Sequence, residues 1–134
     1  MVLPNLEPAV AFLRKRPITY LATSDPAGPA VRAMVVAEVE DDGTIWYATG
    51  TYTNKVRQIS KDPKVSISTW EQGKYLRVLG KAELVEDEAI KKKLWQDSWR
   101  TYFSGSDDPT LVLVKIKPDK IELWSSQEAA RGKG

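Results

Sequence analysis

The feature that most constrains this chain is the recurrence of turn-forming residues between short runs that favour β-strands. Residues 24–29 and 41–43 are rich in Pro, Gly, Asp and Ser, and residues 71–74 contain Gly73. Each of these turn segments separates two such runs. Links this short join antiparallel strands, because parallel neighbours need a long crossover. The predicted strands are Ile18 to Thr23, Ala30 to Val39, Thr44 to Thr49, Val65 to Trp70, Tyr75 to Val85, Leu111 to Ile116 and Lys120 to Trp124.

Three segments between these runs have helical features. Apolar residues with helical spacing precede Pro17, capping residues open a helix near Asn54, and acidic residues from Glu86 lie where the positive end of a helix dipole favours them. Helices are therefore predicted over residues 6–13, 54–60 and 86–99.

The strand pattern favours a sheet that closes on itself. Gly80 interrupts a long predicted strand and is expected to mark a bulge or bend, and Lys117-Pro118-Asp119 is expected to turn the last two strands into a closing hairpin. Closure removes exposed sheet edges. We predict a mainly β (α+β) fold, a small antiparallel β-barrel with peripheral helices. Residues 1–134 are expected to form one domain, with a flexible tail over residues 127–134.

Composition excludes several classes of function. The chain contains no His and no Cys, so a Ser-His-Asp triad, a cysteine nucleophile, zinc sites built on these residues, and haem or iron–sulfur ligation by them are excluded. The net charge of +2 argues against bulk nucleic-acid binding. The longest aliphatic stretch, residues 33–37, is far shorter than the ~20 residues of a membrane span. We expect a soluble, cytoplasmic protein that binds neither nucleic acid nor membrane.

Arg32 stands out in the apolar segment of residues 31–36. Strand alternation places it on the same face as Met34. A guanidinium among apolar neighbours costs desolvation unless an anion meets it, and its planar fork suits a phosphate. The alternatives are an edge-strand arginine in solvent, or an arginine paired with Glu38 or Glu40.

Residues 49–55 lead from a strand end through a glycine and several hydroxyl groups into the helix near Asn54. The first turn of a helix offers unpaired N–H groups and a positive dipole end, and Lys55 at that end is better placed if an anion is present. The alternative is simple capping by Thr53 with a solvated Lys55. The spacing lacks the phosphate-loop pattern of nucleoside triphosphate-binding proteins. Together with Arg32, the segment is a candidate phosphate site.

The aromatic residues are a third candidate. Five Trp in 134 residues could include a wall that stacks on a planar ring, although packing in a core or a subunit interface is the alternative. Trp95 and Trp99, one helical turn apart, fit that alternative. The acidic residues give no acid–base pair, and their spacing matches no EF-hand.

Several segments, in this order, resemble the pyridoxamine 5′-phosphate oxidase-like flavoproteins. They are Arg32-Ala33-Met34-Val35, Ile45-Trp46-Tyr47-Ala48-Thr49, Thr53-Asn54-Lys55-Val56-Arg57-Gln58-Ile59, Asp62-Pro63-Lys64-Val65-Ser66 and Val78-Leu79-Gly80-Lys81-Ala82-Glu83. The similarity extends from Thr19 to about Trp124. The closing segment Ile121-Glu122-Leu123-Trp124 and the helix with Trp95 and Trp99 look most like the general-stress-protein branch. The resemblance implies a split β-barrel of six to seven antiparallel strands, and a homodimer with two FMN sites at its interface.

The resemblance also implies residue roles. Arg32 and Lys55 would hold the FMN phosphate with the Thr53 hydroxyl, Thr49 would contact the flavin, and backbone groups of residues 33–35 would line the isoalloxazine ring. The cofactor-binding residues implied in this way are Arg32, Ala33, Met34, Val35, Thr49, Thr53, Asn54, Lys55 and, from the partner subunit, Trp95 or Trp124.

The chain departs from the authentic oxidase. Ala37 stands where the oxidase has a substrate-phosphate lysine, Tyr75 replaces a flavin-contacting glutamine, and the C-terminal Arg-x-His is absent. We therefore expect an FMN-dependent oxidoreductase that acts on another small molecule, with NAD(P)H as a candidate reductant. The alternatives are a flavin-binding stress protein without turnover, or a reductase that uses the deazaflavin F420.

Overall fold

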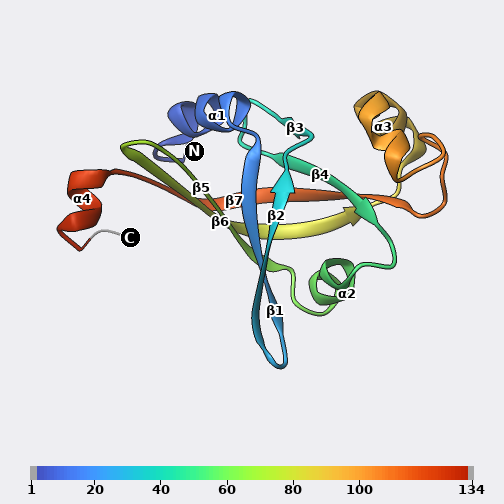
Figure 1. Ribbon diagram of the computed structural model, residues 1–134, viewed down its shortest axis with the longest axis horizontal. Helices are drawn as coiled ribbons and strands as arrows, with labels where there is room; N and C mark the ends of the chain where they lie inside the picture. Colours follow the sequence, from blue (N-terminus) through green and yellow to red (C-terminus); the bar gives the residue numbers. More distant parts are fainter. Residues whose placement is uncertain (1–2, 133–134) are drawn as a thin grey trace.

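The structure, a computed structural model, describes residues 3–132, which form seven strands, four α-helices and one short 3-10 helix (Figure 1). The strands form one antiparallel sheet in the order β2-β1-β5-β6-β7-β4-β3. The predicted mainly β, antiparallel fold with peripheral helices is confirmed. The elements are α1 (Leu6–Lys15), β1 (Ile18–Asp25), β2 (Gly28–Val35), β3 (Glu38–Val39), β4 (Ile45–Gly50), α2 (Asn54–Lys61), β5 (Lys64–Glu71), β6 (Lys74–Val85), α3 (Glu88–Leu94), η1 (Asp97–Thr101), β7 (Leu111–Ser125) and α4 (Ser126–Ala130).

The two edge strands of the sheet are neighbours in sequence. β2 and β3 lie at opposite ends of the strand order, yet only Val36 and Ala37 separate them. The sheet must therefore curl until its edges approach each other at this corner. The N–H of Val36 donates to the carbonyl of Pro17, and the N–H of Ala37 donates to the carbonyl of Trp46, both at 2.8 Å. Within residues 3–132 no ladder joins β2 to β3, so the barrel is split rather than closed.

The inside of the curled sheet holds the hydrophobic core. Along β1, β5 and β6 alternate side chains are buried, as expected for a sheet with one face on a core. The apolar stripe of α1 packs on the same core. Figure 1 shows α3 and α4 at opposite ends of β7. Core members include Val10, Leu13, Leu21, Tyr47, Ile67, Leu76, Val78, Val114 and Ile116.

The predicted strand from Ala30 to Val39 is wrong in its extent. β2 ends at Val35, because the chain leaves one sheet edge there and joins the opposite edge at Glu38. The alternation itself is confirmed: Val31, Ala33 and Val35 are exposed, while the residues between them are partly buried.

The predicted closing hairpin is also wrong, because β7 continues through Lys117-Pro118-Asp119 beside β6. The pairing shifts from Leu79 opposite Lys120 to Gly80 opposite Pro118, which leaves Asp119 as an extra residue in a bulge. A proline, which has no N–H to donate, is tolerated at such a position. The prediction that Gly80 marks a bulge is confirmed.

The predicted helix over residues 86–99 is interrupted. α3 ends at Leu94, Trp95 has an extended backbone with ψ of 135°, and η1 follows. The Gln96 side chain donates to the carbonyl of Ala37 at 3.2 Å, which ties this break to the corner between β2 and β3. The rings of Trp95 and Trp99 nevertheless meet edge to face, with centroids 5.6 Å apart.

Part of the tail that was expected to be flexible is helical. α4 begins with a capping box, in which the Ser125 hydroxyl accepts from the Glu128 N–H and the Glu128 carboxylate accepts from the Ser125 N–H. Residues 133 and 134 of the predicted tail lie outside the described residues. Among the helices of residues 3–132, none combines the length and the hydropathy that crossing a bilayer requires.

The close packing at the bulge predicts that one methyl group added at Gly80 destabilises the protein. A Cβ at Gly80 would overlap the carbonyl oxygen of Lys117, which is backbone and cannot move aside. We expect Gly80→Ala to lower the free energy of unfolding by about 1–3 kcal/mol, the usual cost of overpacking. Lys81→Ala, at the next and exposed position of β6, is the control. Equal urea midpoints for the two variants would contradict the prediction.

Candidate functional site

A cavity of about 560 Å³ opens where the corner between β2 and β3, the end of β4, the start of α2 and η1 meet. Six of the residues implied by the family resemblance line it, namely Ala33, Met34, Val35, Thr49, Thr53 and Lys55. The structure therefore brings together segments that are far apart in the sequence. The other lining residues are Val36, Ala37, Ala48, Gly50, Tyr52, Gln96, Ser98, Trp99, Tyr102 and Phe103.

Arg32 directly precedes the cavity-lining residues of β2, and its side chain lies on the inner, partly buried side of the strand. Its Nη1 donates to the carbonyl of Leu21 at 3.1 Å and to the Thr23 hydroxyl at 2.8 Å. Its Nη2 donates to Oε1 of Gln58 at 2.8 Å. Burial lowers the pKa of the guanidinium. Within residues 3–132 Arg32 forms no ion pair, so the alternative of pairing with Glu38 or Glu40 is wrong.

Lys55 is the second partly buried cation of the site. Its Nζ turns back from the first turn of α2 and donates to the hydroxyl of Thr49 at 3.0 Å. Burial lowers the pKa of Lys55, and the positive charge of Arg32 lowers it further. No carboxylate of the described chain pairs with Lys55. Two cations thus repel each other beside the cavity, and an anion bound between them would relieve both the repulsion and the desolvation.

The start of α2 faces this pair without a side-chain cap. Thr53 stands at the N-cap position, but its hydroxyl donates to the carbonyl of Gly50 at 2.9 Å and accepts no bond from the helix. The alternative of simple capping by Thr53 is therefore wrong. The first N–H groups of a helix have no intrahelical acceptor, so those of α2 are available to a ligand.

Aromatic residues form part of the cavity lining. Trp99, Tyr102 and Phe103 come from η1 and the loop after it, and Tyr52 comes from the loop before α2. These residues belong to the aromatic set of the sequence, which was not assigned to a site. Gln96 and Gln58 were not predicted, because their contacts depend on how distant segments pack and have no local sequence signal.

Four of the residues implied by the resemblance do not line the cavity of their own chain: Arg32, described above, and Asn54, Trp95 and Trp124. Asn54 accepts a hydrogen bond from Arg57 at 2.9 Å. Trp95 packs against Trp99, with the Arg100 guanidinium over its ring. Trp124 stacks on Tyr75 on the outer side of the sheet, with ring centroids 5.8 Å apart. The tryptophans were expected to reach the flavin from the partner subunit, and that expectation stays a prediction.

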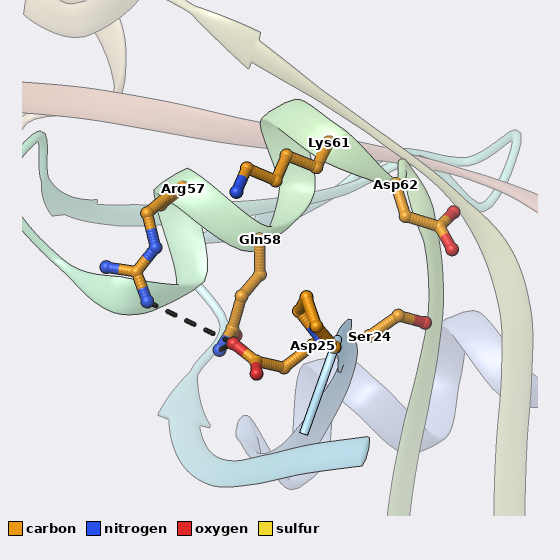
Figure 2. A pocket seen from close by; sticks show the side chains of 7 residues that line it. Ser24, Asp25, Arg57, Gln58, Lys61 and Asp62 are labelled. Atoms are coloured by element: carbon orange, nitrogen blue, oxygen red, sulfur yellow. Dashed lines mark hydrogen bonds and ion pairs between the residues drawn. The ribbon is translucent and has the colours of Figure 1, made fainter. Parts of the chain in front are cut away.

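A second cavity, of about 500 Å³, lies on the other side of α2 (Figure 2). Asp25, Arg57, Gln58 and Lys61 contribute to its lining. The Nε2 of Gln58 donates to Oδ2 of Asp25 at 2.9 Å, and Arg57 Nη2 lies 4.0 Å from the same oxygen. Gln58 thus separates this cavity from Arg32.

Comparison with known proteins assigns the family. A sequence profile described as "Pyridoxamine 5'-phosphate oxidase like" matches residues 10–133. The chain belongs to this family. It is similar to General stress protein 26 of Bacillus subtilis (strain 168), with 32% identity over 113 residues, covering 81% of this chain and 79% of the relative. The predicted resemblance to the family and to its general-stress-protein branch is confirmed.

Solved structures of family members have the same fold. The General Stress Protein 26 of Bacillus anthracis str. Sterne is 25% identical, covers 90% of this chain and 94% of its own, and has a TM-score of 0.78. The general stress FMN/FAD binding protein of Xanthomonas citri is 19% identical, covers 90% of this chain and 87% of its own, and also has a TM-score of 0.78. At this identity the second likeness shows the fold alone.

The lowered pKa of Lys55 predicts that this side chain destabilises the folded state when no ligand is bound. The folded state binds this proton less readily than the unfolded chain, so the cost is present at neutral pH and disappears as the pH rises past the unfolded value of 10.5. We expect Lys55→Met to be more stable than wild type at pH 7, by less than about 1 kcal/mol because the ammonium is only partly buried. The difference should shrink towards pH 10.5.

The measurement is urea unfolding of the ligand-free protein at a series of pH values. Lys61→Met, on the exposed side of the same helix, is the matched control for the loss of one lysine charge. A Lys55→Met variant that is less stable than wild type at pH 7 would contradict the prediction.

Proposed function

We propose that the protein binds FMN in the cavity between the β2–β3 corner and η1, with the phosphate between Arg32 and Lys55. The observation that carries this proposal is the pair of partly buried cations without a carboxylate partner in the described chain, beside the uncapped start of α2. Charge-assisted hydrogen bonds from both side chains suit a phosphate dianion. The FMN/FAD-binding relative of the same fold supports a flavin as the ligand.

The rest of the cavity suits a planar ring. Residues 33–37 line the cavity together with the aromatic residues Trp99, Tyr102 and Phe103. Such a lining would orient a flavin by stacking and backbone hydrogen bonds. When bound, a flavin supplies the hydride and electron-transfer chemistry itself, so a chain without His or Cys needs only to bind, orient and shield it.

We propose an oxidoreductase that acts on a small molecule, with NAD(P)H as the candidate reductant. Pyridoxamine phosphate is not the proposed substrate, because Ala37, which lines the cavity, has no charge to hold a substrate phosphate. Steady-state NAD(P)H oxidation above the rate of free FMN would support turnover. FMN binding without such oxidation would favour the alternative, a flavin-binding stress protein. Preference for the deazaflavin F420 over FMN would favour the other alternative.

We also propose that two chains form a homodimer through the outer face of β1, β2 and β5. Ile18, Val31 and Val35 on this face are each more than 60% exposed, and Tyr20 and Trp70 are about half exposed. An apolar patch of this kind marks an interaction surface. Val35 belongs both to this face and to the cavity lining, so a partner subunit would complete the flavin site.

The phosphate assignment predicts the effect of removing either cation. We expect Arg32→Ala and Lys55→Ala each to weaken FMN binding at least about tenfold, because each variant loses a charge-assisted hydrogen bond. The measurement is titration by flavin absorbance and fluorescence after desalting. Lys61→Ala, which removes an exposed cation from the same helix, is the control. Unchanged titration curves in both cavity variants would refute the site.

The dimer proposal predicts that a charge introduced on the apolar face weakens dimer formation. Ile18→Lys places a charge where an apolar contact is proposed, and we expect it to shift sedimentation from dimer towards monomer. Because Ile18 is 61% exposed, the substitution leaves the core intact. Ser60→Lys, an added charge on the exposed side of α2, should leave the sedimentation unchanged. A wild-type protein that sediments as a monomer would contradict the proposal.

A further inference from the structure

A hydrogen-bonded chain lies behind Arg32, and the phosphate assignment does not use it. Gln58 of α2 is 6% exposed. Its Oε1 accepts from Arg32 Nη2 at 2.8 Å and from the Thr23 hydroxyl at 2.6 Å. Its Nε2 donates to Oδ2 of Asp25 at 2.9 Å. Figure 2 shows the ends of the Gln58 and Asp25 side chains next to each other beside α2. The buried Gln58 amide thus makes three hydrogen bonds. It connects the Arg32 guanidinium to the Asp25 carboxylate, and these two groups form no ion pair with each other.

Asp25 decides which way this amide faces. A carboxylate accepts hydrogen bonds and does not donate them, so Nε2 must face Asp25 and Oε1 must face Arg32. The carboxyl is fixed in turn by the N–H of Ala27, which donates to Oδ1 at 3.0 Å. The hydrogen bonds from Ala27 and Gln58 lower the pKa of Asp25 below its ordinary value of 3.8.

The same contacts define which edge of the Arg32 guanidinium is available. Of its five N–H groups, the two on Nη1 are occupied by Leu21 and Thr23, and one on Nη2 is occupied by Gln58. No acceptor in residues 3–132 meets the remaining two, on Nε and Nη2. Two N–H groups on one guanidinium are what a bidentate phosphate contact uses.

The choice of an amide preserves the charge of Arg32. A carboxylate at position 58 could accept the same hydrogen bonds, but it would neutralise the guanidinium and compete with an incoming phosphate. Because Gln58 stands between them, the Asp25 carboxylate is one side chain further from the Arg32 guanidinium. Arg57 Nη2 lies 4.0 Å from this carboxylate. Arg32 is therefore anchored and remains fully cationic.

We propose that Gln58, oriented by Asp25, is a positioning residue that presents an anchored and uncompensated Arg32 guanidinium to the phosphate of the ligand. This inference rests on the proposed function, since it assigns Gln58 a part in that same site. It also extends the site to two residues, Gln58 and Asp25, that do not line the flavin cavity.

The experiment compares FMN with riboflavin, which has the same ring system and no phosphate. Dissociation constants for both are measured by flavin fluorescence with the full-length wild type, Gln58→Glu, Gln58→Leu and Asp25→Ala. We expect both Gln58 variants to lose about tenfold in FMN affinity, and Asp25→Ala about threefold, while riboflavin affinity stays within about twofold. Asp62→Ala, which removes another carboxylate from the lining of the second cavity, is the matched control.

The outcomes separate this inference from the proposed function. A wild type that binds FMN no better than riboflavin would refute the phosphate site itself. A wild type that prefers FMN, with Gln58→Glu keeping that preference or losing both ligands equally, would overturn the positioning role. If the apolar Gln58→Leu does not fold, Gln58→Glu and the partly exposed Asp25→Ala give the decision. The inference fails if the ratio of FMN affinity to riboflavin affinity in these two variants equals the ratio in the wild type.

Discussion

The cavity depends on the way the two edges of the sheet are joined. Because two residues, Val36 and Ala37, link strands at opposite edges, the sheet has to curl, and its corner is fixed by hydrogen bonds to Pro17 and Trp46. The same corner lines the cavity, and Gln96, another lining residue, donates a hydrogen bond to the Ala37 carbonyl of this corner. The geometry of the cavity is thus a consequence of the topology of the barrel.

The two cations at this cavity destabilise the protein when no ligand is bound. Arg32 and Lys55 are partly withdrawn from water, repel each other and have no carboxylate partner in the described chain. Such an arrangement is costly in the absence of a ligand and is typical of functional sites, where stability is exchanged for binding. The contacts of Arg32 with Thr23 and Gln58 hold the guanidinium in place without reducing its charge.

Local signals in the sequence predicted much of this structure. The tight turns, the alternation around Arg32 and the helix start before Lys55 depend on neighbouring residues, and each lies where it was expected. Lys117-Pro118-Asp119 was misread, because pairing with β6 outweighs the turn tendency of Pro118 and turns it into a bulge opposite Gly80. The role of Gln58 could not be predicted, since it arises only when α2 packs against β1 and brings Thr23, Asp25 and Arg32 to one amide.

The segment of residues 86–110 connects β6 and β7, which already pair with each other as an antiparallel ladder. It is therefore an elongated hairpin loop, and its length and composition can change without altering any strand register. This loop carries Trp99, Tyr102 and Phe103 of the cavity lining, whereas Arg32 and Lys55 come from β2 and α2. A change in the loop would therefore alter which compounds reach the cavity while leaving both cations in place.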